Sequence, residues 1–359
     1  MTSPTAADDL QAALLNTASA VVEAGVARGA LPSGILAVAD RERILRLDAR
    51  GPLGTDAIVL IASITKSIVS LAMLQLVERG LLLLNEPVVA RIPEFGANGK
   101  HDVRLWHLLT HTSGLDEAWI DLAGGRLGQA TADRIVELAC QAPLQFRPAS
   151  RYAYCNASFF VMAELLQRVT GHDHASYLQA HVLDPLGMDD TSYTPPVSPR
   201  VAAVVNAPWS DDDEAARARW IGARFPGGGL WSTATDLVRF GQCLLRQGAP
   251  LLAPATWRTM TALHTQGIPE ATPSGDVPSY YGLGVSKIGP RNHNGPSAEL
   301  RTPDGFGHGG ATGTYLWVEP AYDLVFVFLS NHWGTTDDTF RRALNATIAA
   351  RSAAIGGAG

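Results

Sequence analysis

The sequence predicts an α/β (α+β) fold built from a discontinuous α/β domain and a mainly helical domain inserted into it. Helical periodicity runs through the middle of the chain in pieces separated by Pro and Gly, and short apolar segments of strand composition lie before and after it. We therefore expect residues 1–62 together with 275–359 to form the α/β domain, and residues 63–274 to form the helical domain. The crevice between two such lobes is where a small-molecule site is most often found.

The amino-terminal part begins with one expected helix and two expected strands. Residues 8–28 open with two aspartates and continue with leucines and valines at helical spacing, and acidic residues are favourable in the first turn of a helix. The apolar segments "GILAVAD" (34–40) and "RILRLDA" (43–49) are separated by only two residues, so we expect them to pair as strands.

The middle of the chain has helical patterns, and the carboxyl-terminal part returns to strands. The helical segments are "KSIVSLAMLQLVERG", "RLWHLLTH", "ATADRIVELACQ", "NASFFVMAELLQRVTG", "SYLQAHVLDPLG" and "TATDLVRFGQCLLRQG". Strands are then expected at 281–288, 313–320 and 324–330, followed by a closing helix over 337–352.

Composition and charge exclude several classes of protein. The chain is 46% hydrophobic and 17% charged, and its net charge of −6 offers no basic surface for nucleic acid. No apolar run approaches the ~20 residues that span a bilayer, and the amino terminus lacks the basic and apolar regions of a signal peptide. The three cysteines have neither metal nor disulfide spacing. We therefore expect a cytoplasmic protein without nucleic-acid or membrane partners; the sequence does not indicate its oligomeric state.

The first candidate for chemistry is a serine and a lysine three residues apart in "IASITKSIVS" (61–70). The chain contains only three lysines, so a lysine in this apolar run is unusual. A helix places residues i and i+3 on one face, and burial among isoleucine and valine would lower the pKa of the Lys66 amine, so that it could accept the proton of the Ser63 hydroxyl. The alternative is structural: Ser63 helps to cap a helix, and Lys66 extends to solvent.

A second candidate is "RYAYCNASFF", in which Tyr154 and Asn156 precede an expected helix. Tyr154 would direct its phenol toward the serine, and Asn156 would hydrogen-bond the lysine or the substrate. Taken alone, the two residues fit a packed tyrosine and an N-capping asparagine better.

The glycine-rich segment "GFGHGGATGTYLWVEP" (305–320) formally matches the dinucleotide motif G-x-G-x-x-G. A strand rather than a helix follows it, so a nucleotide site is rejected and no cofactor is expected. Glycines that enter a strand let a substrate approach the backbone, and an N–H of this strand could face a developing oxyanion. His107 and His111 are spaced i and i+4, but no glutamate or third ligand accompanies them, so we expect a structural role and no metal.

These motifs, taken in order, resemble those of a known family. Ser63-Ile64-Thr65-Lys66, Tyr154-Cys155-Asn156 and His308-Gly309-Gly310 are similar to the S-x-x-K, Y-x-N and K/H-x-G motifs of the serine β-lactamase-like family. This family groups class C β-lactamases with related penicillin-binding proteins, esterases, D-aminopeptidases and transesterases. The stretches "LWHLLTHTSGL", "DPLGMDDTSY", "GGGLWSTATDLVRF" and "YGLGV" are similar as well, and the resemblance extends from about residue 15 to 350.

The resemblance implies a fold and a set of roles. The fold would be a mostly antiparallel sheet flanked by helices and joined to an all-helical lobe, with the site between them. Ser63 would be the nucleophile, Lys66 its general base and Tyr154 the proton partner in acylation and deacylation. Asn156 would orient Lys66 or the substrate, and the oxyanion would lie between the backbone N–H groups of Ser63 and Ala311.

The third motif departs from the family pattern for anionic substrates. His308 and Gly309 stand where β-lactamases and penicillin-binding peptidases usually carry a lysine and a threonine or serine, the groups that hold the substrate carboxylate. A largely neutral histidine and a glycine favour uncharged acyl substrates, esters first. By the resemblance, these two residues, Gly310 and Asn156 would contact substrate. Trp119, Trp231, Trp317 and Trp333 are candidates for the wall of an acyl pocket, although ordinary packing explains any single one of them equally well.

The leading expectation is a serine hydrolase that works through an acyl-enzyme, most simply a carboxylesterase acting on small to medium esters. A D-amino-acid amidase or aminopeptidase is the alternative among enzymes, with weak β-lactam hydrolysis after it. From a different class, the chain could be a non-catalytic protein that binds an acyl or peptidoglycan-derived ligand. The sequence does not distinguish hydrolysis from acyl transfer to an alcohol.

Overall fold

A six-stranded sheet forms one half of the molecule, in the order β2-β1-β10-β9-β8-β7, and every neighbouring pair in it is antiparallel. The computed structural model describes residues 6–209, 214–289 and 299–356. The strands of this sheet are β1 (Gly34–Ala39), β2 (Ile44–Arg50), β7 (Ser286–Lys287), β8 (Phe306–Gly310), β9 (Thr314–Glu319) and β10 (Leu324–Leu329). The antiparallel sheet implied by the family resemblance is confirmed.

Strand β10 lies inside the sheet, and all six of its residues are buried. Leu324, Phe326 and Phe328 point to one core, and Val325 and Val327 point to the other. Successive side chains of a strand alternate between the faces of a sheet, so a continuous apolar run marks a strand that is covered on both faces.

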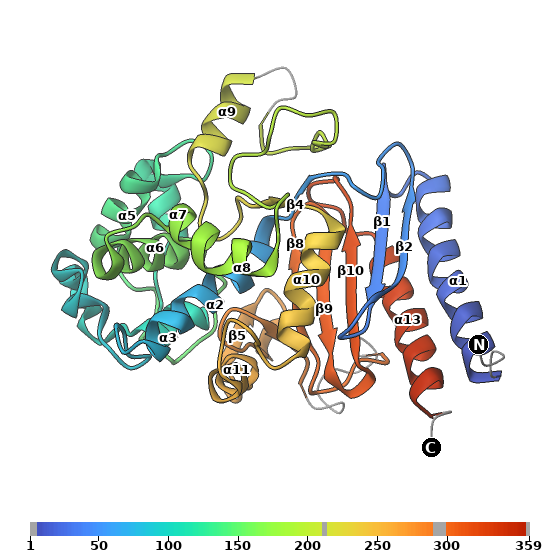
Figure 1. Cartoon of the computed structure of the whole chain (residues 1–359). Helices are drawn as coiled ribbons and strands as arrows, with labels where there is room; N and C mark the ends of the chain where they lie inside the picture. The colour runs from blue at the N-terminus through green and yellow to red at the C-terminus, as the bar shows by residue number, and fades with distance from the viewer. Residues whose placement is uncertain (1–5, 210–213, 290–298, 357–359) are drawn as a thin grey trace.

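Helices cover the two faces of the sheet. The helices α1 (Ala6–Ala27) and α13 (Thr339–Gly356) lie side by side on one face, and α10 (Ala234–Leu245) lies on the other (Figure 1). Residues Asp9–Ala27 are long and apolar enough to cross a membrane by length and composition. In this structure, however, side chains of α1 such as Leu15 and Val22 pack into the core beneath the sheet.

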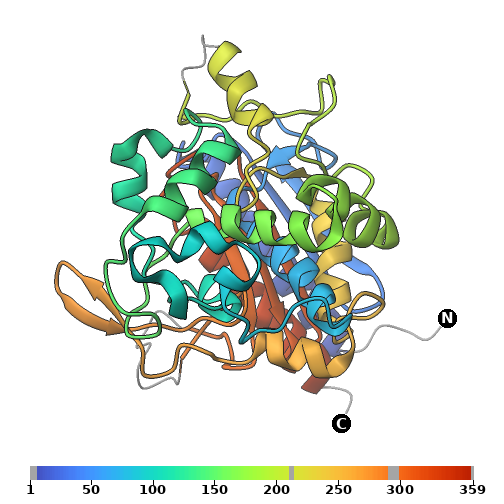
Figure 2. The same ribbon diagram turned by 90° about the vertical axis from the view of Figure 1, so that its left-hand side faces the viewer.

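The other helices form a lobe beside the edge of the sheet that carries β8 and β7 (Figures 1 and 2). They are α2 (Thr65–Glu78), α3 (Leu105–Leu109), α4 (Glu117–Ile120), α5 (Ala132–Gln141), α6 (Ala157–Thr170), α7 (His174–Leu178), α8 (Asp184–Leu186), α9 (Glu214–Gly222) and α11 (Pro254–Thr261), with the short 3-10 turn η1 (Ala62–Ile64) before α2. Helix α2 is buried from Thr65 to Leu74, so it forms the centre of this lobe.

The structure differs from the sequence prediction in three places. Helix α10 falls inside the range predicted for the helical domain, yet it packs on the sheet. The rest of the predicted division into two domains stays a prediction. The strand expected over 281–288 is reduced to β7. Two small sheets were not foreseen, β3 (Val59–Leu60) with β4 (Trp231–Ser232) and β5 (Pro269–Thr272) with β6 (Gly275–Pro278).

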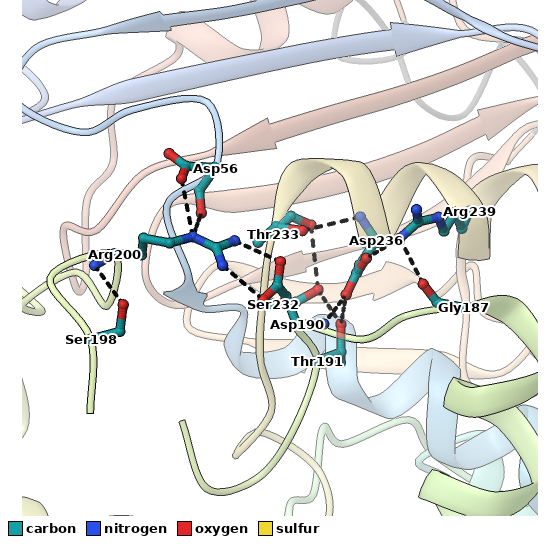
Figure 3. Close-up of polar contacts among 10 residues, drawn as sticks. All are labelled: Asp56, Gly187, Asp190, Thr191, Ser198, Arg200, Ser232, Thr233, Asp236 and Arg239. Carbon is teal, nitrogen blue, oxygen red and sulfur yellow. Dashed lines mark hydrogen bonds and ion pairs between the residues drawn. The ribbon is translucent and has the colours of Figure 1, made fainter. Parts of the chain in front are cut away.

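A polar network ties α10 to the segment that follows α8 (Figure 3). The buried Asp236 carboxylate accepts hydrogen bonds from the Asp190 N–H and the Thr191 hydroxyl, both at 2.9 Å. The Arg200 guanidinium forms ion pairs with two aspartates, at 2.6 Å from the Asp190 carboxylate and 3.1 Å from the Asp56 carboxylate. Two of the stretches that resemble the family, "DPLGMDDTSY" and "GGGLWSTATDLVRF", therefore meet in a structural network.

Candidate active site

Ser63 lies in η1, at the junction of β3 and α2, and its backbone is held from two sides. The N–H of Ile61 donates to the Leu230 carbonyl at 2.9 Å, and the Thr314 hydroxyl donates to the Ile61 carbonyl at 3.1 Å. Ala62 has a φ of 45°, in the left-handed region that residues other than glycine rarely adopt. This constrained turn leaves Ser63 in the wall of a pocket.

Lys66 is buried in the first turn of α2, and its Nζ has three polar neighbours. These are Ser63 Oγ at 3.1 Å, Asn156 Oδ1 at 2.9 Å and the Gly227 carbonyl oxygen at 2.7 Å. The two carbonyl-type oxygens can only accept hydrogen bonds. When the amine is neutral, its two N–H groups serve these oxygens, and its lone pair is left for the Ser63 hydroxyl, the one neighbour that can donate.

The surroundings of Lys66 lower the pKa of its amine, which favours the neutral form that can accept a proton. Burial lowers the pKa of Lys66 from 10.5 to about 7, against the smaller opposing effect of the Glu117 charge. Aromatic rings supply much of this burial, since Nζ lies 4.8 Å from the Tyr154 ring centroid and 5.2 Å from that of Phe159. A large fraction of the amine is therefore neutral near neutral pH, as a general base requires.

Glu117 fixes the orientation of Asn156, and the sequence analysis did not find it. Its carboxylate accepts hydrogen bonds from the backbone N–H and the side-chain amide of Asn156, the latter at 2.8 Å. A carboxylate can only accept, so the amide nitrogen of Asn156 must face Glu117 and the amide oxygen must face Lys66. Asp116, the residue before Glu117, caps α4. An acidic residue at the start of a helix is common, so the sequence around Glu117 did not indicate a role in the site.

Tyr154 lies over Lys66, and it lines the same pocket as Ser63. Its ring is packed against protein on one side, although the residue as a whole is 40% exposed. Desolvation raises the pKa of Tyr154 above its usual value, and the nearby Ser63 hydroxyl opposes this only in part. The phenol is therefore protonated at neutral pH and can pass a proton between the serine side and a leaving group.

His111 holds the loop that carries Tyr154. Its backbone carbonyl accepts from the Ala153 N–H at 2.9 Å, and its ring Nδ1 accepts from the Cys155 N–H at 3.0 Å. The imidazole also stacks on the Tyr154 ring, with 4.3 Å between centroids and 29° between planes. His111 therefore fixes the residues on both sides of Tyr154 as well as the ring itself, in agreement with the structural role expected for it.

The predicted oxyanion donors are brought together at the pocket wall. Ser63 and Ala311 both line the pocket, and Ala311 directly follows β8. The close approach of β8 to the nucleophile requires a glycine at residue 310, because a Cβ there would lie 2.3 Å from the Ile61 carbonyl oxygen. Gly310 thus sets the distance between the two backbone segments that carry the predicted donors.

His308 is buried beside the site, and both of its ring nitrogens are engaged. Its Nδ1 lies 2.7 Å from the Gly309 carbonyl, which can only accept, so Nδ1 carries the hydrogen. The neutral ring then accepts at Nε2 from the Tyr281 hydroxyl at 2.9 Å. Burial, followed by the charge of Lys66, lowers the pKa of His308 to about 3. The imidazole is thus uncharged and has no free nitrogen for a substrate.

The substrate contacts predicted for the third motif stay a prediction. Neither His308, Gly309 nor Gly310 lines the pocket at Ser63, and the two glycines line a separate hollow of about 210 Å³. The reason is geometric, since glycines have no side chain to extend and the histidine ring is held by Tyr281. Their contribution to the site lies in the packing of β8.

The pocket at Ser63 has a volume of about 330 Å³. It is lined by Ala62, Ser63, Asp121, Arg126, Leu127, Tyr154, Asn156, Pro208, Trp220, Phe225, Gly228, Ala311 and Trp333. Trp119 is not among them, and its side chain packs against the main hydrophobic core. Its place in the acyl pocket stays a prediction. Trp333, one of the four tryptophans named as candidates for the acyl pocket, lines it. Trp220, which the sequence pattern did not indicate, lies in the same aromatic wall.

Comparison with known proteins identifies the family of this chain. The family model described as Beta-lactamase matches residues 18–351. The chain belongs to the β-lactamase family. With the geometry above, this makes it a serine hydrolase of the β-lactamase and penicillin-binding protein group.

Relatives within the β-lactamase family include several esterases. The chain is 34% identical to Esterase EstB of Burkholderia gladioli over 213 residues, which cover 53% of this chain and only 54% of that protein. It is 29% identical to Protein Rv1367c of Mycobacterium tuberculosis (strain ATCC 25618 / H37Rv), over 85% of this chain and 86% of the relative. Its fold matches the solved structure of EstCE1, a hydrolase with promiscuous acyltransferase activity, with a TM-score of 0.81 and 21% identity over 94% and 99% of the two chains.

Proposed function

We propose that the protein is a carboxylesterase that hydrolyses small to medium, uncharged esters through an acyl-enzyme at Ser63. The observation that carries the catalytic part is the donor and acceptor balance at Lys66, whose neutral amine has one neighbour able to give it a proton, Ser63.

The proposed mechanism follows from this arrangement. Ser63 Oγ attacks the ester carbonyl carbon while its proton moves to Lys66 Nζ, and the N–H groups of Ser63 and Ala311 stabilise the carbonyl oxygen as it becomes negative. The C–O bond to the alcohol then breaks, and the proton passes from Lys66 through the Tyr154 hydroxyl to the leaving oxygen. Water attacks the acyl-enzyme in a second cycle with the same groups, which releases the acid and restores Ser63.

The state of His308 supports esters over substrates with a carboxylate beside the scissile bond. A neutral ring whose Nε2 is occupied by Tyr281 provides neither a charge nor a free donor for such a carboxylate. The names of two relatives agree with this choice: Esterase EstB, and the Lovastatin esterase of Penicillium rubens (strain ATCC 28089 / DSM 1075 / NRRL 1951 / Wisconsin 54-1255), 29% identical over 75% of this chain. The proposal includes a small-molecule substrate as the partner and a cytoplasmic location, which the burial of the apolar face of α1 against the sheet supports.

A substrate panel tests the proposal. p-Nitrophenyl butyrate, a chromogenic cephalosporin and D-alanine p-nitroanilide are offered to the wild type, to Ser63→Ala and to Ser70→Ala. The last is a matched control in α2, the helix that follows Ser63, and it removes a buried hydroxyl that has no hydrogen-bond partner among the described residues. We expect ester turnover in the wild type and the control, and a loss of about 10⁴-fold or more in Ser63→Ala. Turnover of the anilide but not of the ester would favour the amidase alternative.

Intact-protein mass spectrometry tests the non-catalytic alternative. Mixing the wild type with the butyrate ester is expected to give a transient mass increase of one butyryl group, which clears with time and is absent from Ser63→Ala. An adduct that persists indefinitely, or that also forms on Ser63→Ala, would contradict hydrolysis at this serine.

A further inference from the structure

Trp220 is the one buried residue of helix α9, and its side chain forms part of the wall of the Ser63 pocket. The other described side chains of α9 are exposed or half-exposed, and the helix lies above the rest of the helical lobe (Figure 1). The indole is only 6% exposed. A large side chain in the wall of a substrate pocket limits the size of the substrate that the pocket can hold.

A second hollow lies next to this part of α9, and the indole of Trp220 is not among its lining groups. The hollow has a volume of about 400 Å³ and is lined by residues 128–133 together with Arg219, Gly222 and Ala223, the chain neighbours of Trp220. Leu127 lines the Ser63 pocket, while the next residue, Gly128, lines the second hollow. The indole packs directly on Gly128, because a Cβ on this glycine would lie 2.6 Å from the Cε3 atom of Trp220.

Two separate groups of aromatic rings indicate which part of a substrate would meet Trp220. Tyr154 belongs to a group with His111 and Tyr281, and the leaving alcohol must lie close to Tyr154 to receive its proton. Trp220 belongs to a second group, with centroid distances of 5.6 Å to Trp333 and 6.0 Å to Phe225. Within the described residues no ring contact joins the two groups, although both approach Lys66, whose Nζ lies 4.8 Å from the Tyr154 ring centroid and 5.8 Å from that of Phe225. In the arrangement proposed below, the alcohol lies at Tyr154 and the acyl chain lies on the Trp220 side of the pocket.

We propose that Trp220 determines the acyl-chain length accepted by the enzyme, by closing the Ser63 pocket toward the neighbouring hollow. The wild type is then selective for short acyl groups, and removal of the indole joins the two hollows into one channel for longer chains. This inference rests on the proposed esterase function and adds a specificity-determining residue to it.

Acyl-chain profiles test the proposal. kcat/KM is measured with p-nitrophenyl acetate, butyrate, octanoate and decanoate for the wild type, Trp220→Ala and the less disruptive Trp220→Leu. The control is Trp257→Leu, which removes an indole from the wall of a different, larger hollow of about 640 Å³. Because each newly buried methylene strengthens binding, we expect the ratio of octanoate to butyrate to rise about tenfold or more in both Trp220 variants and to stay unchanged in Trp257→Leu.

The results that would contradict the role of Trp220 differ from those that would contradict the esterase function. Butyrate turnover with an unchanged ratio in Trp220→Leu, whose folding is checked by circular dichroism, would overturn the proposal and leave the esterase function standing. An equal rise in Trp257→Leu would overturn it as well, because the effect would be general loosening. A parallel series of acetate esters of alcohols of increasing length is run on all variants; a length shift seen there alone would contradict the assignment to the acyl side. No turnover of any ester by the wild type would instead contradict the proposed function itself.

Discussion

Lys66 is the residue on which the proposed chemistry depends most directly, because its protonation decides whether Ser63 can lose its proton. Three features of its surroundings act together: burial that lowers its pKa, two oxygens that take its N–H groups, and a serine in the remaining direction. An arginine could not replace it, since a guanidinium stays charged at any pH at which the protein is folded.

The first prediction concerns the pH dependence of activity. Lys66 acts as a base only when neutral, so kcat/KM for an uncharged ester is expected to fall tenfold per pH unit below the pKa of Lys66, about 7. The pKa of His308 is about 3 and that of His111 lies well below its usual value, so neither histidine titrates in this range. Stopped assays from pH 5 to 9 measure the profile, and a rate that is flat down to pH 5 would exclude Lys66 as the base.

The second prediction concerns Glu117, the nearby carboxylate that favours the charged form of Lys66. In Glu117→Gln this charge is gone, so the pKa of Lys66 falls further and the acidic limb of the profile moves to lower pH. One of the two hydrogen bonds to Asn156 is also lost, which we expect to lower the maximal rate. The matched control is Glu137→Gln on the exposed side of α5, which should leave the limb in place. A limb that moves to higher pH in Glu117→Gln would contradict the electrostatic argument.

At the scale of elements, the site depends on loops that are fixed by residues distant in sequence. The Tyr154 loop is held by His111, and the segment after α8 is held on α10 by Asp236. Neither residue reaches the pocket, yet each decides where a segment of the lobe lies.

The third prediction distinguishes two contributions of His111 to the rate: the hydrogen bond that its Nδ1 accepts from Cys155, and the stacking of its ring on Tyr154. In His111→Ala the Cys155 N–H loses its acceptor, and since a displacement of ~1 Å at a catalytic group can cost 10²-fold, we expect kcat to fall by about that factor with little change in KM. His111→Asn can supply an acceptor oxygen close to the position of Nδ1 and suits the φ of 58° at this residue, so it should recover part of the rate. Equal losses in both variants would show that the acceptor is unimportant.

The fourth prediction concerns the network in Figure 3. Asp236→Ala removes a buried carboxylate and leaves the Asp190 N–H, the Thr191 hydroxyl and the Arg239 guanidinium without it. Breaking a buried, hydrogen-bonded charge costs about 3–5 kcal/mol in the free energy of unfolding. Arg200→Ala, at the exposed end of the network, should cost about 1 kcal/mol or less. Denaturant unfolding measures both, and similar values for the two variants would contradict a central role of Asp236.

At the scale of the whole molecule, the buried lysine makes folding stability depend on pH. The pKa of Lys66 is lowered in the folded protein from 10.5 to about 7, so between these values the unfolded chain binds a proton that the folded chain does not. Stability therefore rises with pH across this window.

The fifth prediction follows from that sign. Lys66→Met should be more stable than the wild type at pH 7, and this advantage should shrink by about 2 kcal/mol between pH 7 and pH 9 as the wild type gains stability. Other titrating groups are common to both proteins and cancel in the comparison. Denaturant unfolding at the two pH values measures the difference, and an advantage that grows with pH would mean that Lys66 is not held neutral by the fold.

Local sequence pattern predicted much of the fold and the centre of the site. The apolar run of β10 marked a strand, and the three-residue spacing of Ser63 and Lys66 placed them on one face of a helical turn. Helix α10 was assigned to the wrong layer, because an amphipathic pattern shows which face of a helix is buried but not what covers that face. Trp119 was chosen for its residue type, although burial against the core satisfies a tryptophan equally well.

The sequence by itself determined the groups that can react: a serine with a lysine one turn away, a tyrosine before a helix, and a histidine where related enzymes carry a lysine. These depend on residue identity and short spacing. Only the tertiary structure decided their states, because the partners are remote in sequence: Gly227 for Lys66, Glu117 for Asn156 and Tyr281 for His308. Desolvation and long-range hydrogen bonds arise from packing, so the neutral lysine, the neutral histidine and the wall at Trp220 became visible only in the folded chain.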